Sequence, residues 1–197
     1  TSLKTLGSRP RRKFMFMPDV VEKDSTFYLM LGSGDREKPL DAWTDTYGKT
    51  NYFFMVKDKP SEANWLNGTC DTGAAAPNDK VICLTSLTGI TTSADPSATA
   101  LAASKGWYLG LNPHEQVVTS AITVFGNVTF STHTPTVPVS GACTSNLGTA
   151  RVYNVRYLNA APKPGTNNRS AVVSGGGLPP SPGAGTVTLD DGSTYPF

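Results

Sequence analysis

Charged residues are scarce in this chain of 197 residues, and long apolar runs are missing from it. Asp, Glu, Lys and Arg make up 16% of the residues, whereas 38% are hydrophobic. A disordered segment has the opposite balance, so the composition predicts a chain that folds around a hydrophobic core. No uninterrupted apolar stretch approaches the roughly 18 residues that a membrane-spanning helix requires.

Cysteine and histidine are also few, with three cysteines and two histidines. Their spacing matches neither a zinc site nor a redox CxxC motif. Cys70 and Cys83 enclose twelve residues that are typical of a hairpin loop. Either a disulfide closes this loop and contributes roughly 2 to 3 kcal/mol, or the two residues are independent buried thiols. The disulfide would indicate a secreted protein, and Cys143 would then be free or paired with a cysteine beyond the given ends.

The net charge is only +2, but cations are concentrated near the start of the chain. Five of them fall within the first thirteen residues, at Lys4, Arg9, Arg11, Arg12 and Lys13. Such a cluster either contacts phosphates or forms a solvated lead-in to the first strand. The aromatic pattern of a nucleic-acid binder does not accompany it, so we expect no nucleic-acid partner.

Glycine and proline are abundant, with 19 and 15 residues, and they favour turns over long helices. Short runs rich in aromatic and β-branched residues alternate with polar turns, which predicts an all-β fold. The runs start about 25 to 29 residues apart between Phe27 and Trp107, a spacing that suits either propeller blades or a sandwich. The predicted strands cover residues 14–17, 26–31, 52–56, 81–84, 107–111, 117–124, 128–131 and 170–174.

One short helix is predicted in a loop between Asp95 and Gly106. Asp95 is expected to be its N-cap, Pro96 stands at the first helical position, and the body is rich in alanine. Near the end of the chain, Asp191-Gly192 lies within an alternating segment and predicts a β-hairpin.

The densest charged turn of the chain is Gly32-Ser-Gly-Asp-Arg-Glu37, which follows a predicted strand. Its spacing matches no phosphate-binding loop, and no helix is predicted behind it. Asp35, Arg36 and Glu37 therefore form either a local ion-pair network or a binding site. Elsewhere the carboxylates do not have the spacing of a calcium loop, and the GxSxG motif is absent. We predict no catalytic residue and no metal ligand.

Several segments together resemble a known protein family. The most specific are Tyr28-Leu-Met-Leu-Gly-Ser-Gly-Asp-Arg-Glu-Lys-Pro-Leu40 and Ser174-Gly-Gly-Gly-Leu-Pro-Pro-Ser-Pro182, and residues 12–21, 51–58, 106–111 and 149–161 accompany them. Taken in their order along the chain, these segments resemble the C-terminal part of the PilC/PilY family of type IV pilus tip-associated proteins. The resemblance covers nearly the whole chain.

The resemblance implies a secreted bacterial protein of the cell surface, whose C-terminal region is a modified, quinoprotein-like β-propeller. Residues 1–197 would be the last few blades, incomplete at both ends. The implied function is non-enzymatic: pilus biogenesis, twitching motility and adhesion at the pilus tip. The expected partners are pilin or minor pilins, a host or abiotic surface, and the remaining blades. Rim loops at residues 32–39, 70–83 and 160–168 would make the contacts.

The resemblance implies no cofactor in this chain. The family's calcium loop of spaced aspartates has no counterpart among these residues, so calcium would bind elsewhere in the full-length protein.

Two alternatives come from other functional classes. A quinone-dependent propeller dehydrogenase needs a quinone stacked on tryptophan, but Trp43, Trp65 and Trp107 lie in different segments without a ligand cluster. A secreted carbohydrate-binding β-module would instead use exposed aromatic residues such as Tyr47, Trp65 or Tyr195.

Overall fold

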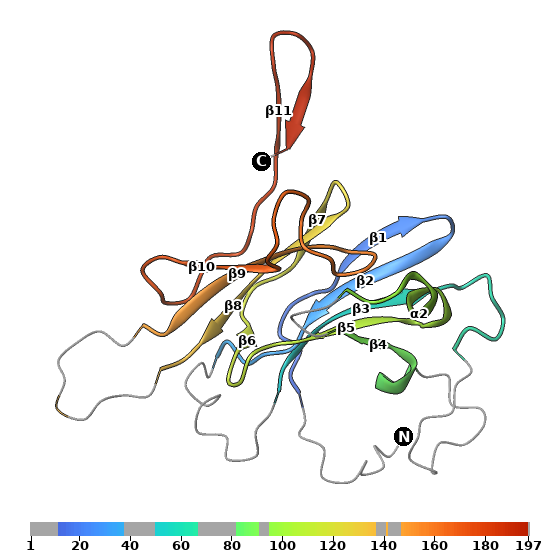
Figure 1. Cartoon of the computed structure of the whole chain (residues 1–197), viewed down its shortest axis with the longest axis horizontal. Helices are drawn as coiled ribbons and strands as arrows, with labels where there is room; N and C mark the ends of the chain where they lie inside the picture. Colours follow the sequence, from blue (N-terminus) through green and yellow to red (C-terminus); the bar gives the residue numbers. More distant parts are fainter. Residues whose placement is uncertain are drawn as a thin grey trace.

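The chain folds as an all-β protein in a computed structural model. The structure describes residues 12–37, 50–66, 82–90, 95–136, 141 and 147–196. Within these residues, two five-stranded sheets follow one another along the chain, and a separate two-stranded hairpin comes last (Figure 1).

The first sheet contains the first five strands along the chain, in the order β1-β2-β3-β5-β4. All neighbouring strands are antiparallel except β4 and β5, which run parallel. Side chains alternate between the two faces of each strand, so that Phe53 and Met55 of β3 point into the protein and are fully buried. The strands are β1 (Asp19–Lys23), β2 (Thr26–Gly32), β3 (Tyr52–Asp58), β4 (Thr88–Ile90) and β5 (Gly106–Gly110).

The second sheet has the order β10-β9-β8-β6, and β7 also pairs with β8. Its longest ladder joins β8 and β9 over eight residue pairs, from Asn127 opposite Arg156 to Thr134 opposite Thr149. The strands are β6 (Gln116–Val117), β7 (Ile122–Val124), β8 (Asn127–Thr134), β9 (Thr149–Arg156) and β10 (Ser170–Val173).

The inner faces of the two sheets share one hydrophobic core. Phe53 of the first sheet stacks on Phe130 of the second, with ring centroids 3.7 Å apart and an interplanar angle of 1°. Phe130 in turn stacks on Tyr153 at 4.8 Å. The buried indole of Trp107 also joins the sheets, because its Nε1 donates a hydrogen bond of 2.8 Å to the carbonyl oxygen of Tyr157. These rings bury the largest apolar surfaces at the seam between the sheets.

Several strand predictions are confirmed and others are wrong. The runs at residues 26–31, 52–56, 107–111, 128–131 and 170–174 lie in β2, β3, β5, β8 and β10. The run at residues 14–17 forms no strand, and the run at 117–124 is divided between β6 and β7. In the described part of residues 81–84, Leu84 begins a 3-10 helix, η1 (Leu84–Ser86). The structure adds β1, β4 and β9, which were not predicted.

The predicted helix exists but begins two residues later than expected. Helix α2 spans Ala98–Ala103, and its N-cap is Ser97, whose side chain accepts a hydrogen bond from the backbone NH of Ala100. The expectations that Asp95 is the N-cap and that Pro96 is the first helical residue are both wrong. Asp95 instead forms an ion pair of 2.5 Å with Arg169, which is 7% exposed.

The predicted hairpin at Asp191-Gly192 is confirmed by β11 (Thr186–Thr188) and β12 (Thr194–Pro196). Gly192 has a φ of 83°, in the left-handed region that glycine adopts without strain. The Asp191 carboxylate accepts hydrogen bonds from the NH and hydroxyl of Ser193, and these bonds hold the pKa of Asp191 below its ordinary value. The hairpin extends away from both sheets (red in Figure 1).

We predict that Phe130→Ala lowers the free energy of unfolding by about 3 to 5 kcal/mol, because it removes a ring that is buried between two others. The matched control is Phe125→Ala, since Phe125 is 64% exposed, and it should cost less than about 1 kcal/mol. Urea unfolding followed by tryptophan fluorescence measures both. Equal losses in the two variants would contradict a core shared by the two sheets.

Candidate functional site

The charged turn singled out in the sequence lies where β2 ends, and main-chain hydrogen bonds hold it from three sides. The NH of Ser33 donates to the carbonyl of Tyr52 at 2.9 Å, and the NH of Gly34 donates to that of Lys13 at 3.0 Å. The carbonyl of Ser33 accepts from the NH of Val117 at 3.0 Å. The turn therefore lies between the first sheet and strand β6 of the second.

The two glycines of the turn are required by close packing rather than by a phosphate. A Cβ atom on Gly32 would lie 2.4 Å from Cγ2 of Val117, and one on Gly34 would lie 2.2 Å from the carbonyl oxygen of Val117. Real Cβ atoms do not approach other atoms so closely. The Gly-Ser-Gly sequence thus allows β6 to lie against the end of β2.

A buried serine connects the turn to the neighbouring loop. Ser33 has no exposed surface; its hydroxyl donates to Oδ1 of Asn51 at 3.0 Å and accepts from the NH of Tyr52 at 2.9 Å. Nδ2 of Asn51 then donates to the carbonyl oxygen of Glu115 at 3.1 Å. This chain of bonds leads from the turn to the loop that precedes β6.

Glu115 is the most completely buried charged residue of this region, with no exposed surface. Its Oε2 accepts hydrogen bonds from the NH of Asn112 at 2.9 Å, from Nδ2 of Asn112 at 2.5 Å and from the hydroxyl of Tyr153 at 3.2 Å. Its Oε1 accepts from the hydroxyl of Thr132 at 2.5 Å. Hydrogen bonds from four donors replace the water that the buried carboxylate has lost.

Glu115 was not among the residues predicted from the sequence, although the sequence carries a weak signal for its role. The spacing Asn112-Pro-His-Glu115 is similar to a capping box, in which a glutamate reaches back to the NH of the residue three positions earlier. Thr132 and Tyr153 come from β8 and β9, so only the folded structure brings them to this carboxylate.

The three predicted binding residues differ in how they are held. The NH of Asp35 donates to Oε1 of Gln116 at 2.8 Å, and its carboxylate forms an ion pair with Lys13. Arg36 and Glu37 are exposed, and neither forms a salt bridge with another residue that the structure describes. The ion pair of the turn is therefore with Lys13 rather than local. The turn presents one anchored carboxylate and two outward-facing charges of opposite sign.

The described part of the N-terminal basic cluster is held by contacts within the chain. The guanidinium of Arg12 lies 4.4 Å from the ring centroid of Tyr52, and its Nε donates to the carbonyl of Thr50 at 2.8 Å. Lys13 pairs with Asp35. These two residues brace the turn, and Lys4, Arg9 and Arg11 lie outside the described residues.

Cys83 is disulfide-bonded. Cys70 and Cys143 lie outside the described residues, so the pairing of Cys83 with Cys70 stays a prediction. The rim loop at residues 160–168 is held at its base by Arg169, whose Nε donates to the carbonyl of Ala160 at 2.8 Å.

The aromatic residues named for the two alternative functions have different surroundings. Trp107 is fully buried in the core. Trp65 is covered by two ammonium groups, with Nζ of Lys59 at 4.6 Å and Nζ of Lys105 at 5.7 Å from its ring centroid. Tyr195, on the projecting hairpin, is 56% exposed. Trp43 and Tyr47 lie outside the described residues.

Where the structure describes the chain, no group of three or more His, Cys, Asp or Glu residues is arranged to hold a metal ion. Nε2 of the buried His133 lies 2.8 Å from the carbonyl oxygen of Leu147.

Across the same described ranges, no helix has the length and apolar character needed to cross a membrane.

Comparisons with known proteins add no relative: no family model, no curated protein and no solved structure is significantly similar to the chain.

We predict that Gly34→Ala lowers the free energy of unfolding by about 3 kcal/mol, because the new methyl group meets the main chain of β6 and one strand must move. Gly183→Ala is the control, since a Cβ there meets no atom within 4 Å, and it should change stability by less than about 1 kcal/mol. Thermal unfolding followed by circular dichroism compares the two variants. A Gly34→Ala protein as stable as the control would contradict the close approach of the turn and β6.

The phenol of Tyr153 makes the stability of the folded chain sensitive to alkaline pH. Burial, together with the charge and hydrogen bond of Glu115, raises the pKa of Tyr153 above its ordinary value of 10.0. The folded protein therefore keeps this proton after the unfolded chain has lost it, and the stabilisation is full below pH 10 and declines as the pH rises further.

The measurement is urea unfolding between pH 9 and 11. Tyr153→Phe should lose stability less steeply than the unmodified chain above pH 10, whereas Tyr195→Phe, which removes an exposed phenol, should follow the unmodified chain. Identical slopes in all three proteins would show that Tyr153 titrates normally.

Proposed function

We propose that this chain is part of a secreted, non-enzymatic type IV pilus tip protein similar to the PilC/PilY family, which acts in pilus biogenesis and adhesion through loop contacts. The observation that carries the proposal is the Gly32–Glu37 segment. Its glycines and serine build a rigid joint between two sheets, and the charged residues Arg36 and Glu37 are exposed beyond that joint. A rigidly supported loop is a suitable element for binding a protein partner.

The arrangement of the sheets supports a propeller, and it would also suit a sandwich. In a propeller each blade is a small antiparallel sheet, consecutive blades follow one another along the chain, and neighbouring blades pack face to face. Here each sheet is formed by consecutive strands, and Phe53 and Phe130 pack the sheets together. On this proposal the two sheets are two adjacent blades of a modified, quinoprotein-like propeller, and the remaining blades are partners of this chain.

The projecting hairpin supports the same proposal. All five residues of β11 and β12 whose burial is described are exposed, and the apolar side chains of Val187 and Tyr195 are 47% and 56% exposed. An isolated two-stranded hairpin is only marginally stable in water. Packing against a further blade would cover these side chains and stabilise the hairpin.

The proposed partners of the Gly32–Glu37 turn are pilin or minor pilins, or a host or abiotic surface. The proposal gives this chain no cofactor, and it places any calcium site elsewhere in the full-length protein.

A secreted carbohydrate-binding module is the second candidate, and the exposure of Tyr195 favours it. An exposed tyrosine ring offers a flat apolar face on which a sugar ring can stack. Glycan-array binding by the purified chain, lost in Tyr195→Ala, would support this candidate over the first.

The test of the first proposal is the double variant Asp35→Ala/Arg36→Ala, introduced into the full-length protein in its host. We expect surface piliation and adhesion to fall severalfold, while stability falls by no more than about 1 kcal/mol because the Lys13–Asp35 ion pair is exposed on its lysine side. Lys23→Ala, which removes an exposed cation at the end of β1 and outside the proposed contact loops, is the control and should leave piliation unchanged. Unchanged piliation in a stable double variant would overturn the role of this turn.

A further inference from the structure

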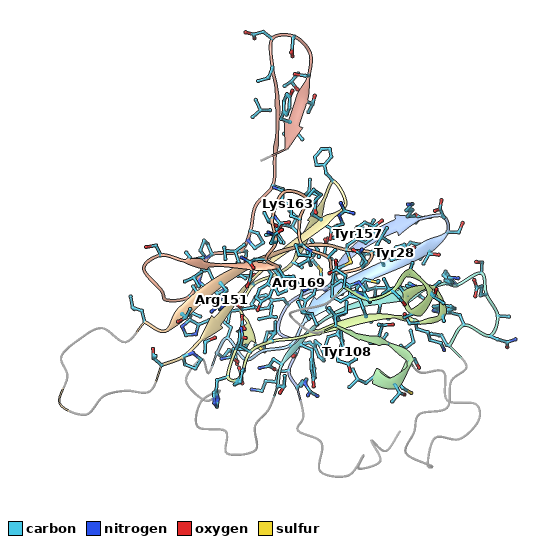
Figure 2. All side chains as sticks on the ribbon, viewed as in Figure 1. Tyr28, Tyr108, Arg151, Tyr157, Lys163 and Arg169 are labelled. Atoms are coloured by element: carbon cyan, nitrogen blue, oxygen red, sulfur yellow. The ribbon has the colours of Figure 1, made fainter. Side chains whose placement is uncertain are left out.

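A groove of about 680 Å³ opens over the seam between the two sheets, far along the strands from the Gly32–Glu37 turn. Both sheets contribute to its floor through Tyr28 and Tyr157, and α2 contributes Leu101. Phe125 of the β7–β8 turn and Leu158 of the segment after β9 line it from the second sheet. Figure 2 shows Tyr28 and Tyr157 next to each other in this region, and their ring centroids are 5.4 Å apart.

Leucine, alanine and proline residues line much of the groove, and of its three aromatic rings only that of Phe125 is largely exposed. The rings of Tyr28 and Tyr157 meet edge to face, with an interplanar angle of 83°, and Tyr157 is only 7% exposed. Leu101, Phe125 and Leu158 together give the groove an apolar surface on which an apolar side chain can pack.

The charge of the groove is positive. Arg156 is exposed at the end of β9 and, among the residues that the structure describes, forms no salt bridge. Lys57 also lines the groove, but its Nζ donates to the carbonyl oxygens of Leu101 and Ser104 at 2.6 and 3.1 Å. No described lining residue is acidic. The nearby Asp95 is paired with Arg169, and Asp24 approaches Tyr157 without lining the groove.

The stability of the β7–β8 turn does not explain why a phenylalanine stands at position 125. It has a φ of 49° and is followed by Gly126 at 81°, in the two-residue turn that joins β7 and β8. Such turns strongly favour asparagine at the first position, and a bulky residue there is strained. The phenylalanine ring is also 64% exposed. Contact with a ligand in the groove would account for an aromatic residue that neither the turn nor the core requires.

We propose that this groove binds a peptide segment in which an apolar side chain stands next to a carboxylate. The apolar side chain lies between Leu101, Phe125 and Leu158, and the carboxylate pairs with the guanidinium of Arg156, which can donate two parallel hydrogen bonds to it. The proposal does not depend on a role at the pilus tip, because the groove and the Gly32–Glu37 turn share no residue.

The experiment titrates the isotope-labelled 197-residue chain with synthetic peptides and follows the backbone amide signals by NMR. The probes are acetyl-Leu-Asp-Leu-Asp-amide and acetyl-Phe-Asp-Leu-Asp-amide, each with a matched peptide that carries Asn in place of Asp. We expect the acidic peptides to shift the signals of Gly126, Asn127 and Arg156, and to bind about tenfold more tightly than the Asn peptides.

Two arginine variants on one strand separate the groove from general charge effects. Arg156→Gln should weaken the acidic peptides about tenfold and leave the Asn peptides unchanged, because only the carboxylate contact is lost. Arg151→Gln is the control, since Arg151 lies near the other end of β9 (Figure 2) and does not line the groove. Equal losses in the two variants, or shifts away from the groove, would overturn the proposal.

A third variant tests the role of the exposed ring independently of folding. Phe125→Asn should weaken peptide binding severalfold while the melting temperature stays the same or rises, because asparagine suits the turn better. A variant that binds the peptides normally would contradict the proposal. Failure of both acidic peptides to shift any groove signal, or tighter binding of an acidic disaccharide such as a galacturonate dimer, would also overturn it.

Discussion

Three aromatic rings in one column connect the two sheets, and the rest of the structure depends on their alignment. Phe53 stacks on Phe130, and Phe130 stacks on Tyr153, so that the column begins in the first sheet and ends in the second. The hydroxyl of Tyr153 then donates to the buried carboxylate of Glu115. Tyr153 therefore belongs both to the apolar column, through its ring, and to the hydrogen-bond network of Glu115, through its hydroxyl.

The hydrogen bonds of Glu115 link the aromatic column to the charged turn at the surface. Glu115 holds the loop before β6, and β6 in turn lies against Gly32 and Gly34 of the charged turn. The side chain of Gln116, the next residue, binds the NH of Asp35. The position of the proposed contact turn is therefore set by a core that lies between the sheets, and the turn has few ways to move independently of it.

The sequence predicts the parts of this arrangement that depend on neighbouring residues. The run Tyr52–Val56 is aromatic and continuous, and it is a strand. Asp191-Gly192 has the turn chemistry of a hairpin, and the hairpin is present. Strand β9 was missed because polar residues interrupt its apolar ones between Thr149 and Arg156, and such a strand is overlooked when only apolar runs are sought. The run at residues 14–17 has the apolar composition of a strand but forms none. A strand also needs a neighbour to pair with, and composition does not reveal whether one is present.

The Gly32–Glu37 turn was found from sequence because its residue types are distinctive, whereas Glu115 was not. The contacts of Glu115 with Thr132 and Tyr153 span 17 and 38 residues, and no local pattern encodes them. The same holds for the groove, whose lining includes residues of β2, β3, α2, the β7–β8 turn and the end of β9.

The buried Trp107 is an intrinsic fluorescent probe of the packing between the two sheets. Its indole has no exposed surface and donates to the Tyr157 carbonyl, an environment that shifts tryptophan emission to shorter wavelengths. Trp65 lies instead beneath the ammonium groups of Lys59 and Lys105, where emission is expected at longer wavelengths. With Trp43 and Trp65 replaced by phenylalanine, only Trp107 would remain. Its emission maximum would then report whether the two sheets separate, without an added label.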